Sequence, residues 1–547
     1  MQILFIASEF FLAVWVLRNT LFWLNLWQIK EYRLDRLWVH LQETVAGRKI
    51  LFSSVVNLLK NFAFLFYVVL IVKPTFLNIE SSIIARYNIF VGILLLYSFS
   101  EVLVEISTRA IKRPILTLKI ILIFLLTIVA SFFLFSFLSS STNKFFSLLF
   151  VDKFLPFIVA LFIGLFAFPS WIVKKQAISK ATQKIQNAKQ LIRIGITGSY
   201  GKGSTKEYLA AILSQKFQVL KTFETINTAI GIAKTINSRL TPNTQVFAAE
   251  MGAYKKGEIK ELCEIVKPRI GILTSVIEQH ASLFGGLAKT KSAKYELIES
   301  LPQDGLALFN GNNANTLELY KKAKVRKILY FADYGSKEKI DADIIAENIK
   351  MGKFDINFDV RTTGKRKINL PVKVNLLGGY NAENILPAIF LGLELGMDKN
   401  EIQKGLSEIS PIKKTMQPFL STDQTVIVDD TFNSNPQAVL AALSYLKIYK
   451  GKKVLVLSPI IELGKNARQI HYDLAKEIGK ACDVLFLTNM NFYEEIKKGI
   501  GENCRVLIQT PQEISAYIAR LGENDIVILE GKEAGKILNF IAYEKAN

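Results

Sequence analysis

The sequence predicts an α-helical transmembrane bundle followed by α/β domains, and three observations lead to this prediction. Apolar residues dominate about the first 175 of the 547 residues. An apolar strand pattern at 192–196 then runs into a glycine-rich turn and a helical pattern. From residue 191 onward, short apolar segments alternate with longer amphipathic ones, which is typical of α/β sheet domains.

The first 175 residues contain five stretches that approach the roughly 20 apolar residues needed to cross a bilayer. Lysines and arginines are concentrated after the first, third and fifth stretches, and the positive-inside rule then places the N-terminus outside. We therefore predict a multi-pass cell-membrane protein with about five helices in a domain over 1–175 and with its catalytic domains in the cytoplasm. The stretches are 3–27, 51–72, 87–106, 115–138 and 154–173.

The formal net charge of +21 does not indicate a nucleic-acid-binding protein. Much of this charge lies beside the apolar stretches, where topology and anionic lipid headgroups explain it. No basic stripe interleaved with aromatic residues is present, so no nucleic-acid partner is expected. The three cysteines have no metal-ligand spacing and are too few for a disulfide framework.

The rest of the chain divides into a connector and two α/β series. Residues 176–190 form a polar connector with a helical pattern. The first series, over 191–412, includes a region of shorter strands at 342–375 and a helix at about 381–395; the second covers 413–547. We predict strands at 192–197, 245–250, 270–275, 305–309 and 327–331, and then at 425–429, 453–457, 484–488, 505–508 and 526–529.

The most informative segment is Thr197-Gly-Ser-Tyr-Gly-Lys-Gly-Ser-Thr205, between a strand and a helical pattern. In such a turn, glycines let backbone N–H groups approach phosphate oxygens, a lysine offsets negative charge, and a hydroxyl can ligate Mg²⁺. The spacing differs from the common Walker form, because Gly203 separates Lys202 from Ser204. We predict that nucleotide phosphates are bound by Gly198, Ser199, Gly201, Lys202, Gly203, Ser204 and Thr205.

Other candidate site residues each have an ordinary structural alternative. Glu250 ends a strand, where a carboxylate can hold Mg²⁺ or simply be solvated. His280 follows another strand end, and a site role is favoured there over a structural one. Lys294 by itself reads as a solvated helix lysine. Asp429 and Asp430 are adjacent in a strand and face opposite ways, which favours ribose or ammonium recognition over general acid–base catalysis.

Together and in this order, these motifs resemble the Mur ligase family over about residues 190–547. Within the family they are most similar to the type that adds D-alanyl-D-alanine to a UDP-muramoyl tripeptide. The resemblance rests on the phosphate loop, Asn227-Thr-Ala-Ile-Gly231, Glu250-Met-Gly-Ala with Gly257-Glu-Ile, His280, Ala293-Lys-Tyr-Glu-Leu, Asn310-Gly-Asn-Asn, Gly379-Tyr-Asn-Ala-Glu-Asn384, Asp429-Asp-Thr-Phe-Asn-Ser-Asn-Pro and Glu462-Leu-Gly with His471.

The resemblance implies a fold and a role for each matching position. It implies a P-loop Mur ligase central domain over 191–412 and a Rossmann-like C-terminal ligase domain over 413–547. Lys202 would contact the β and γ phosphates of ATP, and Asn384 and Asp430 would lie near adenine and near the ribose or incoming amine. Lys294 corresponds to the lysine that is carbamylated in much of the family. The implied ligands of Mg²⁺ are Ser204, Glu250, His280 and Lys294. The implied catalytic residues are Lys202, His280 and Lys294.

The implied activity is ATP-dependent amide ligation in peptidoglycan precursor synthesis. A muramoyl-peptide carboxylate becomes an acyl phosphate, and D-alanyl-D-alanine or a similar amine then attacks it. Apolar stretches stand where ligases of this type carry a UDP-binding domain, which leaves both a UDP-linked and a lipid-linked precursor open as the substrate. A membrane lipid is a further expected partner.

Two other functions stay open from the sequence. One is a poly-γ-glutamate-type peptide ligase, and the other is a nucleotide-driven transporter or membrane scaffold. Few charged residues interrupt the apolar stretches, which argues against a transport path. They are chiefly Arg18, Lys60, Glu101 and Glu105.

Four positions depart from the family pattern and bear mainly on the identity of the amine. The departures are Gly379-Tyr-Asn381 in place of Gly-x-His-Asn, Lys413 or Lys414 in place of an arginine, Ser458-Pro-Ile in place of Gly-Asp-Met, and Glu530-Gly-Lys in place of Lys-Gly-Ser.

Overall fold

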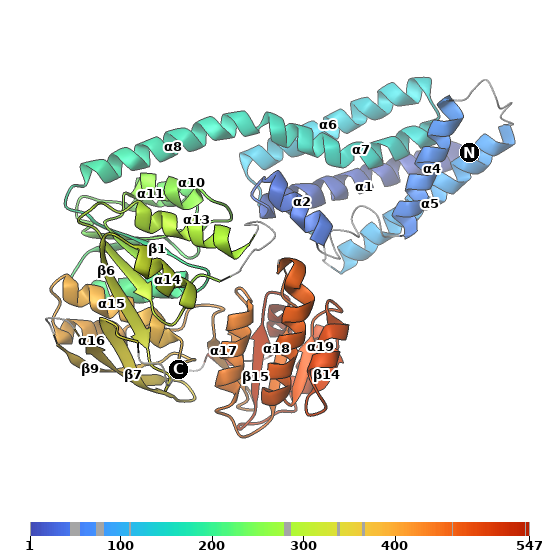
Figure 1. The fold of residues 1–547 in the computed structure, drawn as a ribbon. Helices are drawn as coiled ribbons and strands as arrows, with labels where there is room; N and C mark the ends of the chain where they lie inside the picture. The colour runs from blue at the N-terminus through green and yellow to red at the C-terminus, as the bar shows by residue number, and fades with distance from the viewer. Residues whose placement is uncertain are drawn as a thin grey trace. The chain divides into compact units, whose positions relative to one another are not determined.

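The computed structural model describes residues 2–43, 55–72, 81–108, 111–277, 286–335, 340–363, 367–461, 463–541 and 543–545. The chain forms two compact units, Met1–Lys174 and Lys175–Asn547. The regular elements in the described part of the first unit are all helices, whereas the second contains two β-sheets with their covering helices (Figure 1).

The first unit follows the five predicted apolar stretches, each of which falls largely within helices. Among the described residues, three helical segments are long and apolar enough to cross a membrane by length and composition: Ser82–Ser107, Leu118–Ser140 and Lys144–Asn187. The predicted stretch 154–173 crosses a helix boundary at Phe166, so it belongs to two helices. The helices are α1 (Gln2–Ile29), α2 (Leu34–Glu43), α4 (Val55–Val72), α5 (Ser81–Ser107), α6 (Leu118–Ser141), α7 (Lys144–Leu165) and α8 (Ala167–Asn187).

Charged side chains inside the first unit pair with one another. The guanidinium of Arg18 donates to the carboxylate of Glu105, with 2.7 Å between Nε and Oε2. Lys60 is fully buried, and its ammonium lies 3.4 Å from the carboxylate of Asp152. Pairing offsets the cost of placing these charges among apolar helices. Of the four charged residues noted in the apolar stretches, Arg18, Lys60 and Glu105 are therefore in ion pairs.

A nine-stranded sheet is the centre of the first α/β domain. Its first six neighbouring strands are parallel, as expected for strands joined by helices. The shorter strands predicted at 342–375 extend this same sheet, because β7 pairs in parallel with β6 and then continues as an antiparallel meander. In spatial order the strands are β2 (Val219–Lys221), β3 (Val246–Glu250), β1 (Ile192–Thr197), β4 (Ile270–Leu273), β5 (Leu306–Asn310), β6 (Arg326–Ala332), β7 (Ile344–Met351), β8 (Ile356–Thr362) and β9 (Asn369–Val374).

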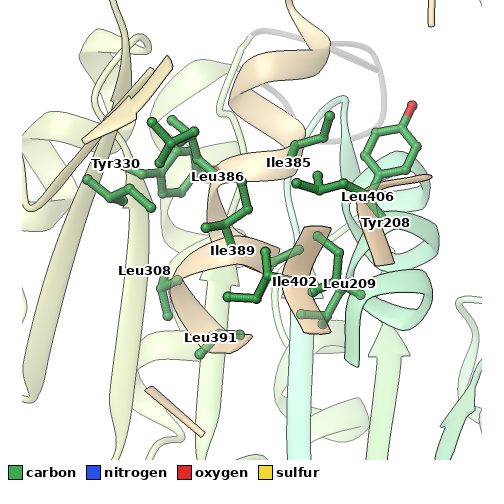
Figure 2. Close-up of a cluster of buried hydrophobic side chains, with 14 of the residues drawn as sticks. Tyr208, Leu209, Leu308, Tyr330, Ile385, Leu386, Ile389, Leu391, Ile402 and Leu406 are labelled. Carbon is green, nitrogen blue, oxygen red and sulfur yellow. The ribbon is translucent and has the colours of Figure 1, made fainter. Parts of the chain in front are cut away.

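Helices cover both faces of this sheet, and alternation along each strand explains the two cores. Ile194 and Ile196 of β1 belong to a buried cluster with α9, α15 and α16. Leu209, Ile385, Ile389 and Ile402 come together in this cluster (Figure 2). The second cluster packs α10, α11 and α13 on the opposite face. The helices are α9 (Lys202–Leu213), α10 (Ala229–Arg239), α11 (Glu258–Val266), α13 (Leu287–Glu299), α14 (Ala314–Lys322), α15 (Asn381–Glu394) and α16 (Lys399–Ser407).

The predicted polar connector is helical, but it is not a separate element. Helix α8 begins at Ala167 and continues through Asn187, so the connector extends the last apolar helix. Within the second unit its residues Ala181 and Ile185 are buried in the second cluster. The ammonium of Lys184 donates to the carbonyl oxygens that end α10, which stabilises the C-terminus of that helix.

The C-terminal domain has a seven-stranded sheet, and five of its strands are parallel in the manner of a Rossmann-like fold. Every strand predicted in this region overlaps an observed strand. Two strands at one edge of this sheet, β10 and β16, were not predicted, and neither was β2, a three-residue strand at the edge of the first sheet. In spatial order the strands are β14 (Arg505–Ile508), β13 (Val484–Leu487), β12 (Lys453–Leu457), β15 (Ile526–Glu530), β11 (Val426–Asp430), β10 (Gln417–Ser421) and β16 (Tyr543–Lys545). The helices are α17 (Pro436–Leu446), α18 (Ala467–Ala481), α19 (Tyr493–Gly499) and α20 (Pro511–Ile518), with 3₁₀ turns at η2 (Gly464–Asn466) and η3 (Ala534–Phe540).

Candidate functional site

The glycine-rich segment forms a tight turn between β1 and the N-terminus of α9. Gly201 is the N-cap of α9 and has φ +81°, a conformation that side chains with a Cβ rarely adopt. A Cβ at Gly201 would also lie 2.5 Å from Oδ1 of Asn384. The first N–H groups of α9 therefore face a closely packed loop, which is the geometry that binds phosphate at a helix N-terminus.

Two lysines converge on one carbonyl oxygen of this loop. The ammonium groups of Lys202 and Lys294 each donate to the oxygen of Gly198 at 2.8 Å. Burial lowers the pKa of Lys202, and burial together with the charge of Lys202 lowers the pKa of Lys294 well below its usual value. Lys294 is 4% exposed, so the sequence-based interpretation of this residue by itself as a solvated helix lysine is wrong. Two cations held this close favour an anion beside the loop.

Glu250 lies where the sequence predicts a metal-binding carboxylate. It ends β3, is 4% exposed, and accepts from the amide of Asn227 at 3.2 Å. Its Oε2 would be 3.6 Å from a Cβ at Gly203, so the carboxylate adjoins the phosphate loop. Ser204 lies in the first turn of α9, and it also lines the cavity beside the phosphate loop.

These oxygen donors fit Mg²⁺, which commonly takes one or two carboxylates from the protein and the remaining ligands from substrate phosphates and water. Within the described residues, no group of three or more His, Cys, Asp or Glu side chains could hold a metal ion. His280 lies outside the described residues. Glu250 and Ser204 would therefore hold the ion together with phosphate oxygens.

Lys206 belongs to this site, and the sequence reasoning did not select it. It is fully buried, and its ammonium lies 3.4 Å from Oε2 of Glu250 while also donating to the carbonyl of Glu224. Its position one helical turn after Lys202 was the available signal, since residues four apart share a helix face. Lys206 holds the carboxylate of Glu250 in place next to the loop.

The start of α15 supplies a further polar group to the site. The carboxyl of Glu383 accepts from the amide of Asn310 at 2.7 Å and from the hydroxyl of Tyr334 at 2.8 Å. Burial raises the pKa of Glu383. Asn384, the next residue, lies against Gly201 and lines the cavity. The structure thus brings Asn384 to the phosphate loop from a distant part of the sequence.

A cavity of about 1080 Å³ joins these groups to the C-terminal domain. It is large enough for a nucleotide and part of a second substrate. Its lining includes most of the predicted site residues, whereas Gly198, Thr205 and Lys294 are not part of it. The predicted residues in the lining are Ser199, Gly201, Lys202, Gly203, Ser204, Glu250, Asn384 and Asp430, and Lys413 and Lys414 are also part of it.

The two adjacent aspartates face opposite sides of their sheet, as predicted. Asp429 accepts from the backbone N–H and the hydroxyl of Thr431. Asp430 instead accepts from the backbone N–H of Met416 at 3.2 Å, and burial raises its pKa to about 6. Of these two aspartates, Asp430 lines the cavity and Asp429 does not.

Comparisons with known proteins give a consistent result. The family model of the Mur ligase middle domain matches residues 196–392, and the model of the Mur ligase glutamate ligase domain matches residues 416–533. A UDP-N-acetylmuramoyl-tripeptide–D-alanyl-D-alanine ligase of Escherichia coli is 30% identical over 314 residues, which cover 57% of this chain and 67% of that protein. The Synechocystis protein with the same name is 32% identical over 296 residues, covering 54% of this chain and 61% of that protein.

Solved structures give the same picture. The structure of MurF from Acinetobacter baumannii is 25% identical with a TM-score of 0.60 and covers 67% of this chain and 80% of that one. MurF from Thermotoga maritima in complex with ADP is 21% identical with a TM-score of 0.59, a likeness in fold, and covers 67% of this chain and 83% of that one. The chain therefore spans about two thirds of the length of the curated relatives it matches, or somewhat less.

Proposed function

This chain belongs to the Mur ligase family, and on that premise we propose that it adds D-alanyl-D-alanine to the carboxylate of a UDP-N-acetylmuramoyl tripeptide at the expense of ATP. The observation that carries the proposal is the phosphate loop: Lys202 and Glu250 line one cavity there, and the ammonium of the buried Lys294 meets that of Lys202 at the carbonyl of Gly198. This arrangement suits phosphoryl transfer, because catalysis there depends mainly on positioning and charge neutralisation.

In this proposal the loop residues bind ATP and align its terminal phosphate with the substrate carboxylate. The N–H groups at the start of α9 bind phosphate oxygens, and Lys202 moves from the carbonyl of Gly198 to the β and γ phosphates. Bound Mg²⁺ would neutralise phosphate charge, with Glu250 and Ser204 of this chain as ligands and His280 as an additional expected one. A carboxylate oxygen of the substrate then takes the γ phosphoryl group of ATP, which releases ADP and gives an acyl phosphate. The amine attacks this acyl phosphate to give the amide and inorganic phosphate.

Lys294 has the environment that carbamylation needs. Only the uncharged amine reacts with CO₂, and burial beside Lys202 favours that form by lowering the pKa of Lys294. A carbamate would replace one of two neighbouring positive charges with a negative one. We include a carbamylated Lys294 in the proposal as an additional metal ligand and catalytic group.

Asn384 and Asp430 complete the proposed site. Asn384 lies against the loop and is assigned to the adenine side of the nucleotide. Asp430 lines the part of the cavity contributed by the C-terminal domain and is assigned to the ribose or the incoming amine.

The apolar helices support a membrane location for the enzyme. We propose a multi-pass membrane domain with the catalytic domains in the cytoplasm, where ATP is available. The three helical segments that could cross a membrane also favour a second candidate substrate, a lipid-linked muramoyl peptide presented at the membrane surface.

The test is ligation by the purified full-length chain with ATP, Mg²⁺ and D-alanyl-D-alanine, supplied separately with UDP-linked and lipid-linked tripeptide. We expect phosphate release and an amide product, detected by mass spectrometry, with the UDP-linked precursor. Lys202→Ala should abolish product formation, whereas Lys216→Ala, an exposed lysine at the far end of the same helical region, should not. Product with only the lipid-linked precursor would favour the second candidate, and no product with either precursor would contradict the proposal.

A further inference from the structure

One segment of chain, residues 408–416, joins the central domain to the C-terminal domain, between α16 and β10. A single covalent connection leaves two domains free to rotate relative to each other unless contacts between them hold one orientation. Both domains line the cavity, so its shape depends on such contacts. The hairpin formed by β7 and β8 of the central domain supplies several of them.

The hairpin tip, residues 352–355, is a tight turn between two antiparallel strands. The backbone N–H of Gly352 donates to the carbonyl oxygen of Asp355 at 2.8 Å. A Cβ at Gly352 would clash with the carboxylate of Asp355, so the turn closes only because this residue has no side chain. The two central residues of the turn are Lys353 and Phe354.

The hairpin tip contacts the end of α17 in the C-terminal domain. The carbonyl oxygen of Lys353 accepts from the hydroxyl of Tyr445, which lies in the last turn of α17. The ammonium of Lys353 lies over the ring of Tyr449, 5.5 Å from its centroid, which is a cation–π contact. Phe354 packs against the buried cluster that contains both tyrosines. Three different interactions therefore connect the hairpin tip to the C-terminal domain.

Helix α17 also forms part of the cavity wall. Gln437, Ala438 and Ala441 of its N-terminal half line the cavity. Tyr445 follows Ala441 by four residues, about one helical turn. Asp430, which ends the strand before α17, lines the cavity as well. One rigid helix thus links the contact at the hairpin tip to the wall that the C-terminal domain contributes.

The same hairpin contacts the segment that leads into α15. The sulfur of Met351, the last residue of β7, accepts from the N–H of Gly379 at 3.2 Å. Tyr380, the next residue, lines the cavity, and so does Asn384 in the first turn of α15. Leu377, in the same segment, is buried in the cluster that contains Tyr445. The hairpin therefore touches both the segment that starts α15 and the end of α17.

We propose that the hairpin tip is a positioning element, which holds α17 and the start of α15 at the separation that the reaction needs. Phe354 and Tyr445 are its positioning residues, because neither lines the cavity and both act through α17. Loss of their contacts moves the wall that carries Asp430 and leaves the phosphate loop intact. The kinetic consequence rests on the proposed function, whereas the placement of the two domains does not.

Distances between spin labels test the placement in the full-length protein in detergent. The three native cysteines are buried, so the labels are attached through Lys404→Cys and Lys480→Cys, at exposed positions on α16 and α18. We expect one narrow distance distribution in the labelled chain with Phe354 present. Phe354→Ala removes the packed ring and should widen the distribution about twofold, and Phe354→Leu should restore most of the narrow width. Equal widths with Phe354 and with Phe354→Ala would overturn the proposal.

Steady-state kinetics separate positioning from a loss of folded protein. Tyr445→Phe removes only the hydroxyl, and we expect it to raise the KM for D-alanyl-D-alanine about fivefold with kcat nearly unchanged. Tyr517→Phe is the matched control, because Tyr517 packs against the other buried cluster of this domain and should keep the original KM. An unchanged KM for Tyr445→Phe, or a loss confined to kcat as expected for partial unfolding, would overturn the proposal.

The two measurements also separate this proposal from the proposed function. Absence of amide product from the unaltered chain would contradict the ligase function, and the widths of the distance distributions would then decide the role of the hairpin tip by themselves. Tyr445→Phe is the smaller change, so labelling it in the same way gives a second test if Phe354→Ala does not fold. A distribution that widens in Tyr445→Phe and not in Tyr517→Phe supports the proposal, and equal widths in these two variants contradict it.

Discussion

The shared carbonyl acceptor of Lys202 and Lys294 explains how the site is prepared for an anion. Each ammonium donates to the oxygen of Gly198, and burial disfavours the charged form of both lysines. A phosphate bound beside the loop would give the two ammonium groups a negatively charged partner in addition to this carbonyl. The free energy gained from relieving the repulsion between two lysines then contributes to ligand binding.

Removal of Lys294 should impair catalysis more than folding. We expect Lys294→Ala to lower kcat by about 10²–10³-fold, since it removes a preorganised charged group from the reacting phosphates. Lys291→Ala is the control, because Lys291 lies one turn earlier on α13 and pairs at the surface with Glu318. Steady-state kinetics with and without added bicarbonate measure the effect; activity of Lys294→Ala equal to that of the control would contradict the prediction.

Loss of Lys206 should destabilise the central domain. Lys206→Met leaves the buried carboxylate of Glu250 without its cation, and breaking a buried pair in this way costs about 3–5 kcal/mol. Denaturant unfolding of the full-length chain in detergent measures the change in the free energy of unfolding. The double variant Lys206→Met with Glu250→Gln should recover part of the lost free energy of unfolding. If the changes caused by the two single substitutions simply add up in the double variant, the two side chains do not interact.

At the scale of single elements, the connection from β1 to α9 depends on one left-handed residue. Gly201 caps α9 at φ +81° and packs against Asn384 of α15. Helix α9 also contributes Tyr208, whose hydroxyl donates to Oδ1 of Asn381 in α15 at 2.8 Å. Helices α9 and α15 therefore hold the phosphate loop through both the apolar cluster in Figure 2 and polar contacts.

Gly201→Ala should weaken ATP binding more than a matched substitution elsewhere. The left-handed backbone alone costs about 1–2 kcal/mol for alanine. Gly257→Ala, at φ +95° with nothing within 4 Å of its Cβ, should carry only that cost. At Gly201 the new methyl also displaces Asn384, so we expect the Kd for ATP to rise about tenfold or more. Calorimetric titration measures both variants, and equal affinities would rule out a role for the contact with Asn384.

For the whole molecule, two buried acidic side chains of the C-terminal domain, Asp430 and Glu530, link stability to pH. The pKa of Asp430 is raised from 3.8 to about 6, and the pKa of Glu530 is raised as well. The native state therefore binds more protons than the unfolded state, and the contribution of Asp430 to stability falls as pH rises from about 4 to about 6. The contribution of Glu530 also falls as pH rises through its raised pKa. We expect Glu530→Gln to melt at a higher temperature than the unaltered chain at pH 7, with a smaller difference at pH 4. A difference that does not vary with pH would contradict this linkage.

The first unit should keep the whole chain in the membrane. The helical segments Ser82–Ser107, Leu118–Ser140 and Lys144–Asn187 are long and apolar enough to cross it. We expect the full-length protein to stay in the membrane fraction after an alkaline carbonate wash, and protease added to intact cells to leave residues 175–547 uncut. Release by the wash would contradict membrane insertion, and cleavage in intact cells would contradict the cytoplasmic location.

The sequence by itself determined the family, the phosphate loop and most strands, because these depend on local patterns. Glycine spacing, a following lysine and apolar alternation act over a few residues, and the matching family models confirm the family prediction. The tertiary structure decided which distant residues meet. It buried Lys294 and Lys206 beside the loop and placed Asn384 against Gly201. It also gave Asp430 a partner one hundred residues away, Glu530, since strand order in a parallel sheet brings together residues that no local pattern connects.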